Sequence, residues 1–167
     1  AALYNHVWGV FCDWYVEFSK PLLADGSAAQ AETRATMAWA LDQCLKLLHP
    51  FTPFVTEALW SQIAARPAML AVTDWPEIGP EAADPEADAR LSRLVALIEA
   101  VRSVRAEMNV PPAVRLELLL TEGDAAMEAE IAEALPLIER LARVEGFRRV
   151  EAAPKGASPA HDAELQR

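Results

Sequence analysis

Residues 49–60, HPFTPFVTEALW, contain the signals that decide the fold. Pro50 ends a helix that approaches it, because proline lacks the backbone N–H that the helix needs. Thr52 is a residue type that caps helices, and Pro53 suits the first helical position, where its missing N–H costs nothing. Apolar residues then recur at helical spacing as far as about residue 65. The stretch therefore predicts one helix that ends near residue 49 and another that begins at residue 53.

The segment before this stretch predicts two helices. Aromatic residues recur at spacings of four and three, the period of one helix face, at Tyr4, Trp8, Phe11, Tyr15 and Phe18. Pro21 and the turn residues at 25–27 end the first helix, and the second runs from about residue 30 to residue 49. Because the loop between them is short, we expect these helices to be antiparallel neighbours.

The aromatic stripe has two interpretations. Rings at helical spacing usually anchor the core of a helical bundle. A ring at the mouth of a groove would instead stack on an unpaired nucleic-acid base, and Phe11 or Trp14 is the candidate for that role. Trp14 lies off the stripe, so it points away from the other rings.

The second half of the chain has mixed periodicity. Residues 66–88 are rich in proline, alanine and acids, which predicts a solvated connection, and a helix follows over about 87–108. VRLELLL at 114–120 alternates apolar and polar residues, and FRRVEA at 147–152 also suggests a strand. A helix over 124–143, which Pro136 should kink or divide, lies between them. A strand–helix–strand unit of this length predicts a parallel strand pair.

These patterns together predict a mainly α fold, an antiparallel helical bundle with a small C-terminal strand–helix–strand α/β element. The predicted division places the helical bundle at residues 1–110 and the α/β element at 111–153. Residues 154–167 have glycine, serine and proline without an apolar pattern, which predicts a flexible, disordered tail.

Composition narrows the class of protein. The chain has 167 residues, of which 53% are hydrophobic, so it can form an ordinary globular core. Its net charge of -10 argues against non-specific coating of nucleic acid, although a local basic patch is compatible with it. We find no signal peptide and no apolar run near the roughly 20 residues of a membrane span.

Cys12 and Cys44 fit buried reduced thiols. A start without Met, already in helical register, suggests a chain cut from a longer protein.

Motifs for catalysis and metal binding are missing. His6, His49 and His161 are isolated in the sequence, and no His or Cys pair has the spacing of a metal site. No glycine-rich loop follows a strand to hold a phosphate, and Gly123 and Gly146 fit turns at the ends of elements. We therefore expect no catalytic residue and no metal ligand, and no self-contained enzyme.

Residues 98–112, IEAVRSVRAEMNVPP, set two arginines against an apolar helix face in an acidic chain. On a helical projection Arg105 lies within the apolar stripe and Arg102 at its rim. One hypothesis is structural: cations near a helix C-terminus favour its dipole while their stems cover apolar surface. The other is functional: the guanidinium groups point into a groove and donate to phosphates or base edges. Asn109 can adopt the left-handed conformation that closes the helix, and its amide could read a base.

At these residues the chain resembles a known family. LYNHVWGVFCDWYVEFSKPLL at 3–23, LKLLHPFTPFVTEALW at 45–60, DWPE at 74–77, and IEAVRSVRAEMNVPP followed by RLELLL are similar to the C-terminal anticodon-binding region of class I aminoacyl-tRNA synthetases of the bacterial valyl type. The HPF and PF pattern alone is shared with the isoleucyl and leucyl types. The order and spacing of all the segments, from residue 3 to about residue 156, make the valyl resemblance specific.

The resemblance implies a function and a set of partners. The domain would bind the anticodon loop of valine tRNA, through Arg102, Arg105, Asn109, Phe11 and Trp14, for a cytoplasmic, monomeric parent enzyme that does not enter a membrane. Valine anticodons share a central adenine followed by cytosine, so recognition should combine stacking with hydrogen bonds to base edges. The few donors that one loop needs would be compatible with an acidic surface elsewhere, which suppresses indiscriminate RNA binding.

The same resemblance limits what the fragment does alone. The catalytic and editing domains of the parent chain would precede it, and a coiled-coil arm would follow after a further strand. ATP and Mg would be cofactors of the parent, with none in this fragment. The HIGH and KMSKS signatures are absent, so we expect neither adenylation of valine nor editing. PAHDAELQR at 159–167 ends the chain where the family continues, which suggests a truncated fragment.

Two alternatives stay open from the sequence. The chain could be the equivalent domain of an isoleucyl or leucyl relative. It could also be a protein-interaction bundle whose arginines pair with acids inside the domain. Binding of an anticodon loop should weaken steeply as salt rises, whereas binding of an apolar protein partner should show little salt dependence.

Overall fold

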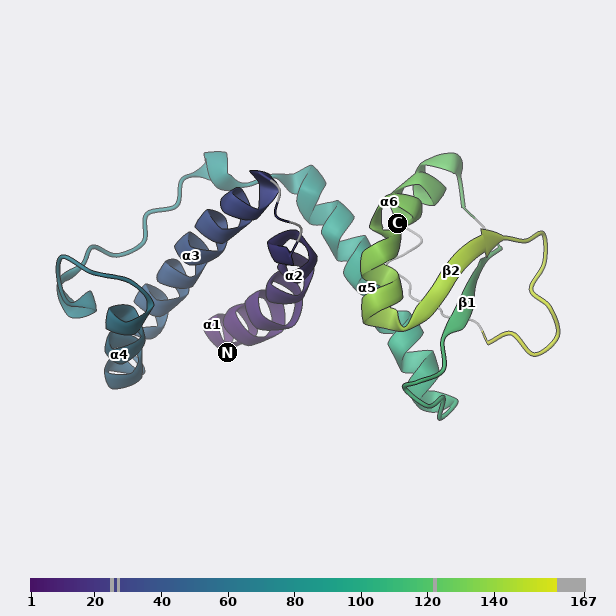
Figure 1. Cartoon of the computed structure of the whole chain (residues 1–167), viewed down its shortest axis with the longest axis horizontal. Helices are drawn as coiled ribbons and strands as arrows, with labels where there is room; N and C mark the ends of the chain where they lie inside the picture. The colour runs from purple at the N-terminus through teal and green to yellow at the C-terminus, as the bar shows by residue number, and fades with distance from the viewer. Residues whose placement is uncertain (25, 27, 122, 159–167) are drawn as a thin grey trace. The chain divides into compact units, whose positions relative to one another are not determined.

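The computed structural model describes residues 1–24, 26, 28–121 and 123–158. The chain forms two compact units, Ala1–Ala82 (unit 1) and Ala83–Arg167 (unit 2), which we describe separately. Unit 1 is helical, and unit 2 combines helices with a two-stranded parallel sheet (Figure 1). This confirms the predicted fold class, mainly α with a small strand element.

The N-terminal helix of unit 1 has an unusual centre. It is one continuous helical segment made of α1 (Ala2–Tyr4), a π-helix η1 (Asn5–Tyr15) and α2 (Val16–Ala24). Pro21 lies inside α2, so the prediction that it ends the helix is wrong. Proline removes one intrahelical hydrogen bond, and the helix continues for three more residues before Gly26, whose φ of 70° ends it.

The helices around HPFTPFVTEALW follow the sequence prediction. They are α3 (Ala28–Leu48) and α4 (Pro53–Ile63), and two short 3₁₀ turns follow, η2 (Leu70–Val72) and η3 (Pro80–Ala82). Thr52 occupies the N-cap position of α4, but the predicted side-chain cap is wrong: its hydroxyl donates to the Leu48 carbonyl of the preceding helix at 3.3 Å. Leu45, Trp60 and Leu70 form the buried core that joins these elements.

Unit 2 is built from α5 (Pro85–Glu107), β1 (Leu116–Leu120), α6 (Ala125–Ala142) and β2 (Val144–Arg149). The strands pair in parallel, as predicted, although β2 begins three residues earlier than the sequence suggested. An irregularity between Leu116 and Leu118 shifts the register. Pro136 lies within α6 without dividing it. The core of the unit is formed by Ile98, Val101, Ile131, Ile138, Ala142 and Val144.

The boundary between the two compact units falls between Ala82 and Ala83 in the sequence, whereas the predicted domain boundary was at 110–111. The difference comes from α5, which packs against α6 in unit 2 and forms ion pairs with it, Arg93 to Glu130 at 2.6 Å and Arg90 to Glu133 at 2.9 Å. The predicted functional division stays a prediction. Of the predicted tail, residues 154–158 are irregular coil, and 159–167, with His161, lie outside the described residues.

Two expectations from composition can be compared with this fold. Within the described chain, no helix has both the length and the apolar character required to cross a membrane. Both cysteines are free thiols, but only Cys44 is buried as predicted, while Cys12 is exposed. Burial raises the pKa of the Cys44 thiol, and the nearby Cys12 adds to the shift.

Candidate nucleic-acid interface

Arg105 does not face a groove. The residue is only 7% exposed, and its guanidinium donates to three backbone carbonyls: Arg143 at 3.2 Å, Pro111 at 3.1 Å and Val114 at 2.8 Å. These oxygens belong to the end of α6 and to the loop between α5 and β1. This side chain holds the loop and the end of α6 together inside unit 2, which favours the structural role, and contact of Arg105 with RNA stays a prediction.

Two further arginines bind the same end of α6. Arg102 donates to the Leu141 carbonyl at 2.9 Å, and Arg115 donates to the carbonyls of Glu139 at 3.3 Å and Val144 at 3.0 Å. The last carbonyls of a helix have no intrahelical partner and carry the negative end of the helix dipole. Positive charge gathers at this part of an acidic chain because it completes α6. The structural hypothesis expected instead that Arg102 and Arg105 favour the dipole of their own helix, with their heads in water, so it is wrong for the buried Arg105.

Asn109 closes α5 as the sequence predicted. It has a φ of 50°, and the Asn109 and Val110 amides donate to the carbonyls of Ala106 at 3.1 Å and Arg105 at 2.9 Å, which is a Schellman motif. Its side-chain amide is exposed and makes only a 3.4 Å contact with the Glu107 carbonyl. A base-reading role for this amide stays a prediction.

The aromatic candidates lie on the π-helix. Phe11 and Trp14 are half-buried; the Phe11 ring pairs with Tyr15 at 5.5 Å between centroids, and the Trp14 ring pairs with Phe18 at 5.7 Å. Trp14 therefore pairs with a ring of the stripe, so the prediction that it points away from the other rings is wrong. Their stacking on RNA stays a prediction. They lie in unit 1, whereas Arg102, Arg105 and Asn109 lie in unit 2.

Part of the aromatic stripe is on the surface. Tyr4 is 65% exposed and Trp8 is 59% exposed, and their rings stack with centroids 6.1 Å apart and planes 7° apart. The interpretation of these two rings as core is wrong within this chain. Tyr4 lies in α1 and Trp8 in the π-helix, so the two rings share one face and that face is exposed.

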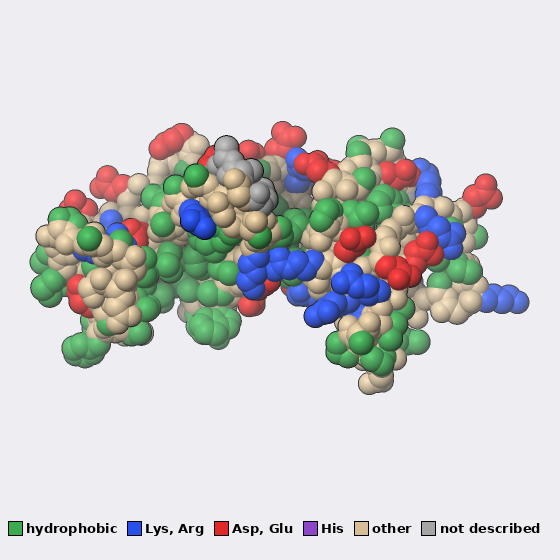
Figure 2. All heavy atoms as spheres, viewed as in Figure 1, with side chains coloured by type: hydrophobic (Ala, Val, Ile, Leu, Met, Phe, Trp, Pro, Cys, Tyr) green, Lys and Arg blue, Asp and Glu red, His purple; other side chains and the backbone are tan. Residues whose placement is uncertain are grey.

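Most other cations of unit 2 are paired with acids. Arg148 contacts Glu117 at 2.8 Å, and Arg149 contacts Glu128. On the side shown in Figure 2, both basic and acidic side chains of this unit reach the surface. Among the described residues, no group of three or more His, Cys, Asp or Glu side chains could hold a metal ion.

A corner of unit 1 joins α3, α4 and η2 through polar contacts that sequence reasoning missed. Arg66 forms a two-point ion pair with Asp42, at 2.6 and 2.7 Å, and lies 3.7 Å above the Trp60 ring. The pKa of Arg66 is raised, chiefly by the hydrogen bond to Asp42. The Trp60 indole N–H donates to the Ala68 carbonyl at 3.1 Å. These contacts fix the course of the chain from residue 66 to η2.

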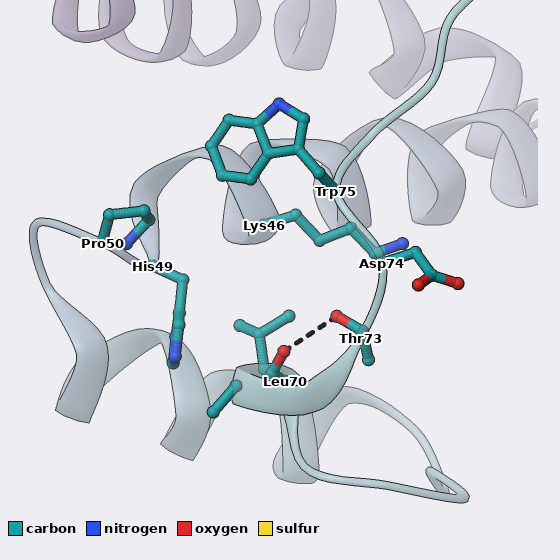
Figure 3. Close-up of a pocket in the computed structure, with 8 residues that line it drawn as sticks. Lys46, His49, Pro50, Leu70, Thr73, Asp74 and Trp75 are labelled. Atoms are coloured by element: carbon teal, nitrogen blue, oxygen red, sulfur yellow. Dashed lines mark hydrogen bonds between the residues drawn. The ribbon is translucent and has the colours of Figure 1, made fainter.

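This corner contains a pocket of about 200 Å³, lined by residues that include Lys46, His49 and Trp75 (Figure 3). The only sequence signal for it was the DWPE stretch, which was noted as part of the resemblance and not as a site. To predict this pocket from the sequence, one would have to know that residues 70–75 fold back against the end of α3. No local sequence pattern shows that.

Comparison with known proteins gives the class. The family described as the anticodon-binding domain of tRNA ligase matches residues 1–120. The chain therefore belongs to the anticodon-binding domain family of tRNA ligases.

The similar relatives within this class are valine–tRNA ligases. The relative from Cereibacter sphaeroides is 53% identical over 156 residues, covering 93% of this chain and 16% of the relative. The relative from Caulobacter vibrioides is 48% identical, covering 95% of this chain and 18% of the relative. The relative from Brucella suis is 46% identical, covering 94% of this chain and 18% of the relative. The chain thus spans less than a fifth of the length of these relatives and matches only their anticodon-binding part.

Proposed function

We propose that this chain binds the anticodon loop of valine tRNA as part of a valine–tRNA ligase. The supporting observation is the identity of 46–53% to valine–tRNA ligases over more than nine-tenths of the chain, together with the family match. In this proposal the parent is a cytoplasmic, monomeric enzyme whose catalytic and editing domains use ATP and Mg to charge the tRNA with valine. The fragment positions the tRNA and holds no cofactor itself.

A titration of the chain with two RNA hairpins tests the proposal. One hairpin has the loop of valine tRNA, and the control hairpin has the same stem with the alanine anticodon. Because base edges in an unpaired loop are read by stacking and hydrogen bonding, we expect tighter binding of the valine hairpin. Equal affinities for both hairpins would contradict anticodon recognition by this chain, and a protein-interaction role would predict no binding of either.

The exposure of the candidate residues supports a role for each of them. We propose Asn109, Phe11 and Trp14 as contacts with the loop, since Asn109 is exposed and the two rings are partly accessible. Arg102 is also exposed, and we propose it as a further contact with the loop. Replacing Asn109 or Phe11 with Ala should raise the Kd for the valine hairpin by about 5- to 100-fold, the range for one base contact.

A further inference from the structure

One side of α4 is apolar and open to solvent. Phe54 is 92% exposed, more than any other large hydrophobic residue of the described chain, and Phe51 just before the helix is 74% exposed. Further apolar residues of the helix are exposed as well: Val55, Ala58, Leu59 and Ile63. Figure 2 shows hydrophobic side chains on the surface in the place where Figure 1 draws α4. A continuous apolar surface on a folded domain marks an interaction site.

The exposed apolar residues share one half of the helix circumference. On a projection of 100° per residue with Phe54 at zero, they fall between zero and about 180°. The buried Thr56 and Trp60 fall at about 200° and 240°. The helix therefore uses one half of its circumference for the core of unit 1 and presents the other half to solvent. We call this exposed half, together with Phe51, the α4 face.

The α4 face carries no charge. Residues 50–65 contain no lysine or arginine, and their single acid is Glu57, at about 300° on the projection. Its carboxylate is used within the unit, where it accepts from the backbone amides of Leu70 at 2.8 Å and Ala71 at 3.2 Å. The only polar side chain of the face is the amide of Gln62.

This composition selects the kind of occupant. RNA would need cations for its phosphates and donors or acceptors for its base edges. A helix that lies on a membrane surface usually carries lysine and arginine beside its apolar side. Interfaces between parts of a protein that stay together are apolar, with aromatic anchors at their centre, as on the α4 face. The face therefore fits an apolar protein surface.

The length of the relatives indicates which protein surface is available. This chain covers only 16–18% of the valine–tRNA ligases that it matches, so more than four-fifths of such a protein lies outside it. A surface on the same polypeptide is held near α4 at a high effective concentration, which a separate partner does not have.

We propose that the α4 face is a docking surface for an apolar part of the parent polypeptide outside residues 1–167, with the rings of Phe51 and Phe54 as anchors. The inference rests on the proposed function, because it needs the parent protein. It gives α4 a role without RNA contact, which is to hold unit 1 in a fixed position on the rest of the parent.

Labelling of a cysteine within the α4 face measures whether the face is covered. Ala58→Cys places a small thiol there, and its reaction with N-ethylmaleimide is followed by mass spectrometry of the peptide that contains it. In the isolated 167-residue chain this thiol should react at the rate of an exposed thiol. In the full-length parent without tRNA it should react at least about tenfold more slowly, because a covered thiol reacts only when the interface opens.

Val72→Cys is the matched control. Val72 is 73% exposed, and it belongs to η2, whose backbone is held by Glu57 on the side of α4 away from the α4 face. Its thiol should react at the same rate in the isolated chain and in the full-length parent. Equal slowing of both thiols in the parent would show that the protection is not specific to the α4 face, and would overturn the proposal.

Phe54→Ser tests the anchor itself. In the isolated chain the substitution lies on the surface, so the melting temperature should stay within about 2 °C of the unsubstituted chain. In the full-length parent it leaves a cavity in the interface, so the unfolding transition should fall by more than this. An equal fall in the isolated chain would show that the ring is already covered within residues 1–167, against the proposal. The Kd of the isolated variant for the valine hairpin should be unchanged.

The other occupants are distinct outcomes of the labelling experiment. Protection of Ala58→Cys in the isolated chain that grows with protein concentration would identify a second copy. Protection that appears only with the valine hairpin would identify RNA, and protection only with phospholipid vesicles would identify a membrane surface. Each of these results would overturn the proposal, as would equal labelling in the isolated chain and the parent.

The proposed function is tested separately by hairpin binding. If the isolated chain binds the valine hairpin and Ala58→Cys is not protected in the parent, the docking surface is refuted and the proposed function stands. If the chain binds neither hairpin and Ala58→Cys is protected in the parent, anticodon binding fails and the docking surface stands.

Discussion

Replacing Arg105 with Ala provides the sharpest test of why this acidic chain keeps an arginine within an apolar helix face. The substitution removes three charge-assisted hydrogen bonds and leaves the carbonyls of Arg143, Pro111 and Val114 without that donor. A hydrogen bond to a charged group contributes about 1.5–3 kcal/mol, and bonds that share one side chain are not additive. We therefore expect a loss of about 2–4 kcal/mol in the free energy of unfolding of unit 2.

The loss should be visible as a large change in melting temperature. For a unit of this size, about 1 kcal/mol corresponds to 4–8 °C, so the transition should fall by about 8–32 °C. Far-UV circular dichroism follows both units, whereas tryptophan fluorescence reports only on unit 1, because all five Trp residues precede residue 83. The circular dichroism transition should therefore shift more than the fluorescence transition. Arg102→Ala is the matched control, since it removes the hydrogen bond to the Leu141 carbonyl at an exposed position and should cost less than about 1 kcal/mol.

RNA binding distinguishes the structural role from the earlier functional hypothesis. At a temperature where the variant is folded, Arg105→Ala should bind the valine hairpin with the Kd of the unsubstituted chain. A variant that melts within about 2 °C of the unsubstituted chain would refute the structural reasoning. A folded variant with a raised Kd would restore Arg105 as an RNA contact.

Further expectations concern thiol chemistry, loop geometry and salt. Iodoacetamide should alkylate Cys12 well before Cys44, measured by mass spectrometry. Because the folded state raises the pKa of Cys44, it retains the thiol proton more strongly than the unfolded state, so stability should fall as pH rises through the ordinary thiol value of about 8.5 in urea titrations. Glu57→Gln weakens the acceptor for two amides and should lower the melting temperature of unit 1 by about 4–12 °C, followed by tryptophan fluorescence. Asn109→Gly should keep or raise stability at this positive φ, whereas Asn109→Val should cost about 1–2 kcal/mol in chemical unfolding. The logarithm of the Kd for the valine hairpin should rise with the logarithm of the salt concentration, with a slope that corresponds to about one or two neutralised phosphates. The measurement runs between low and physiological ionic strength.

The sequence predicted the parts of the fold that depend on local chemistry. Pro50 and Pro53 define the break between α3 and α4, and Asn109 ends α5 in the left-handed conformation, because each of these residues restricts its own backbone. The alternation in VRLELLL likewise predicted β1 within two residues. The parallel pairing followed from the length of the segment between the two strands.

The parts that failed depend on partners distant in the sequence. The helical projection placed Arg105 in the apolar stripe correctly, but only the fold shows that the carbonyl of Arg143 comes within its reach. Tyr4 and Trp8 are exposed because no other part of the described chain covers their face, and apolar spacing alone does not predict which face is covered. The pocket was missed for the same reason, since Trp75 and Lys46 are brought together by a turn that Glu57 holds.

The placement of charge constrains how such a domain can recognise RNA. Arg105, Arg102 and Arg115 complete the end of α6, and Arg90, Arg93, Arg148 and Arg149 pair with acids, so much of the positive charge of unit 2 is used within the fold. Affinity that came mainly from phosphates would accept any RNA, because the backbone carries no sequence information. A domain that keeps its arginines for its own fold must instead obtain binding energy from bases, through stacking and edge contacts. An acidic surface then contributes to specificity, because it repels every RNA. Only an RNA that also places a base in a binding site gains favourable contacts that offset this repulsion.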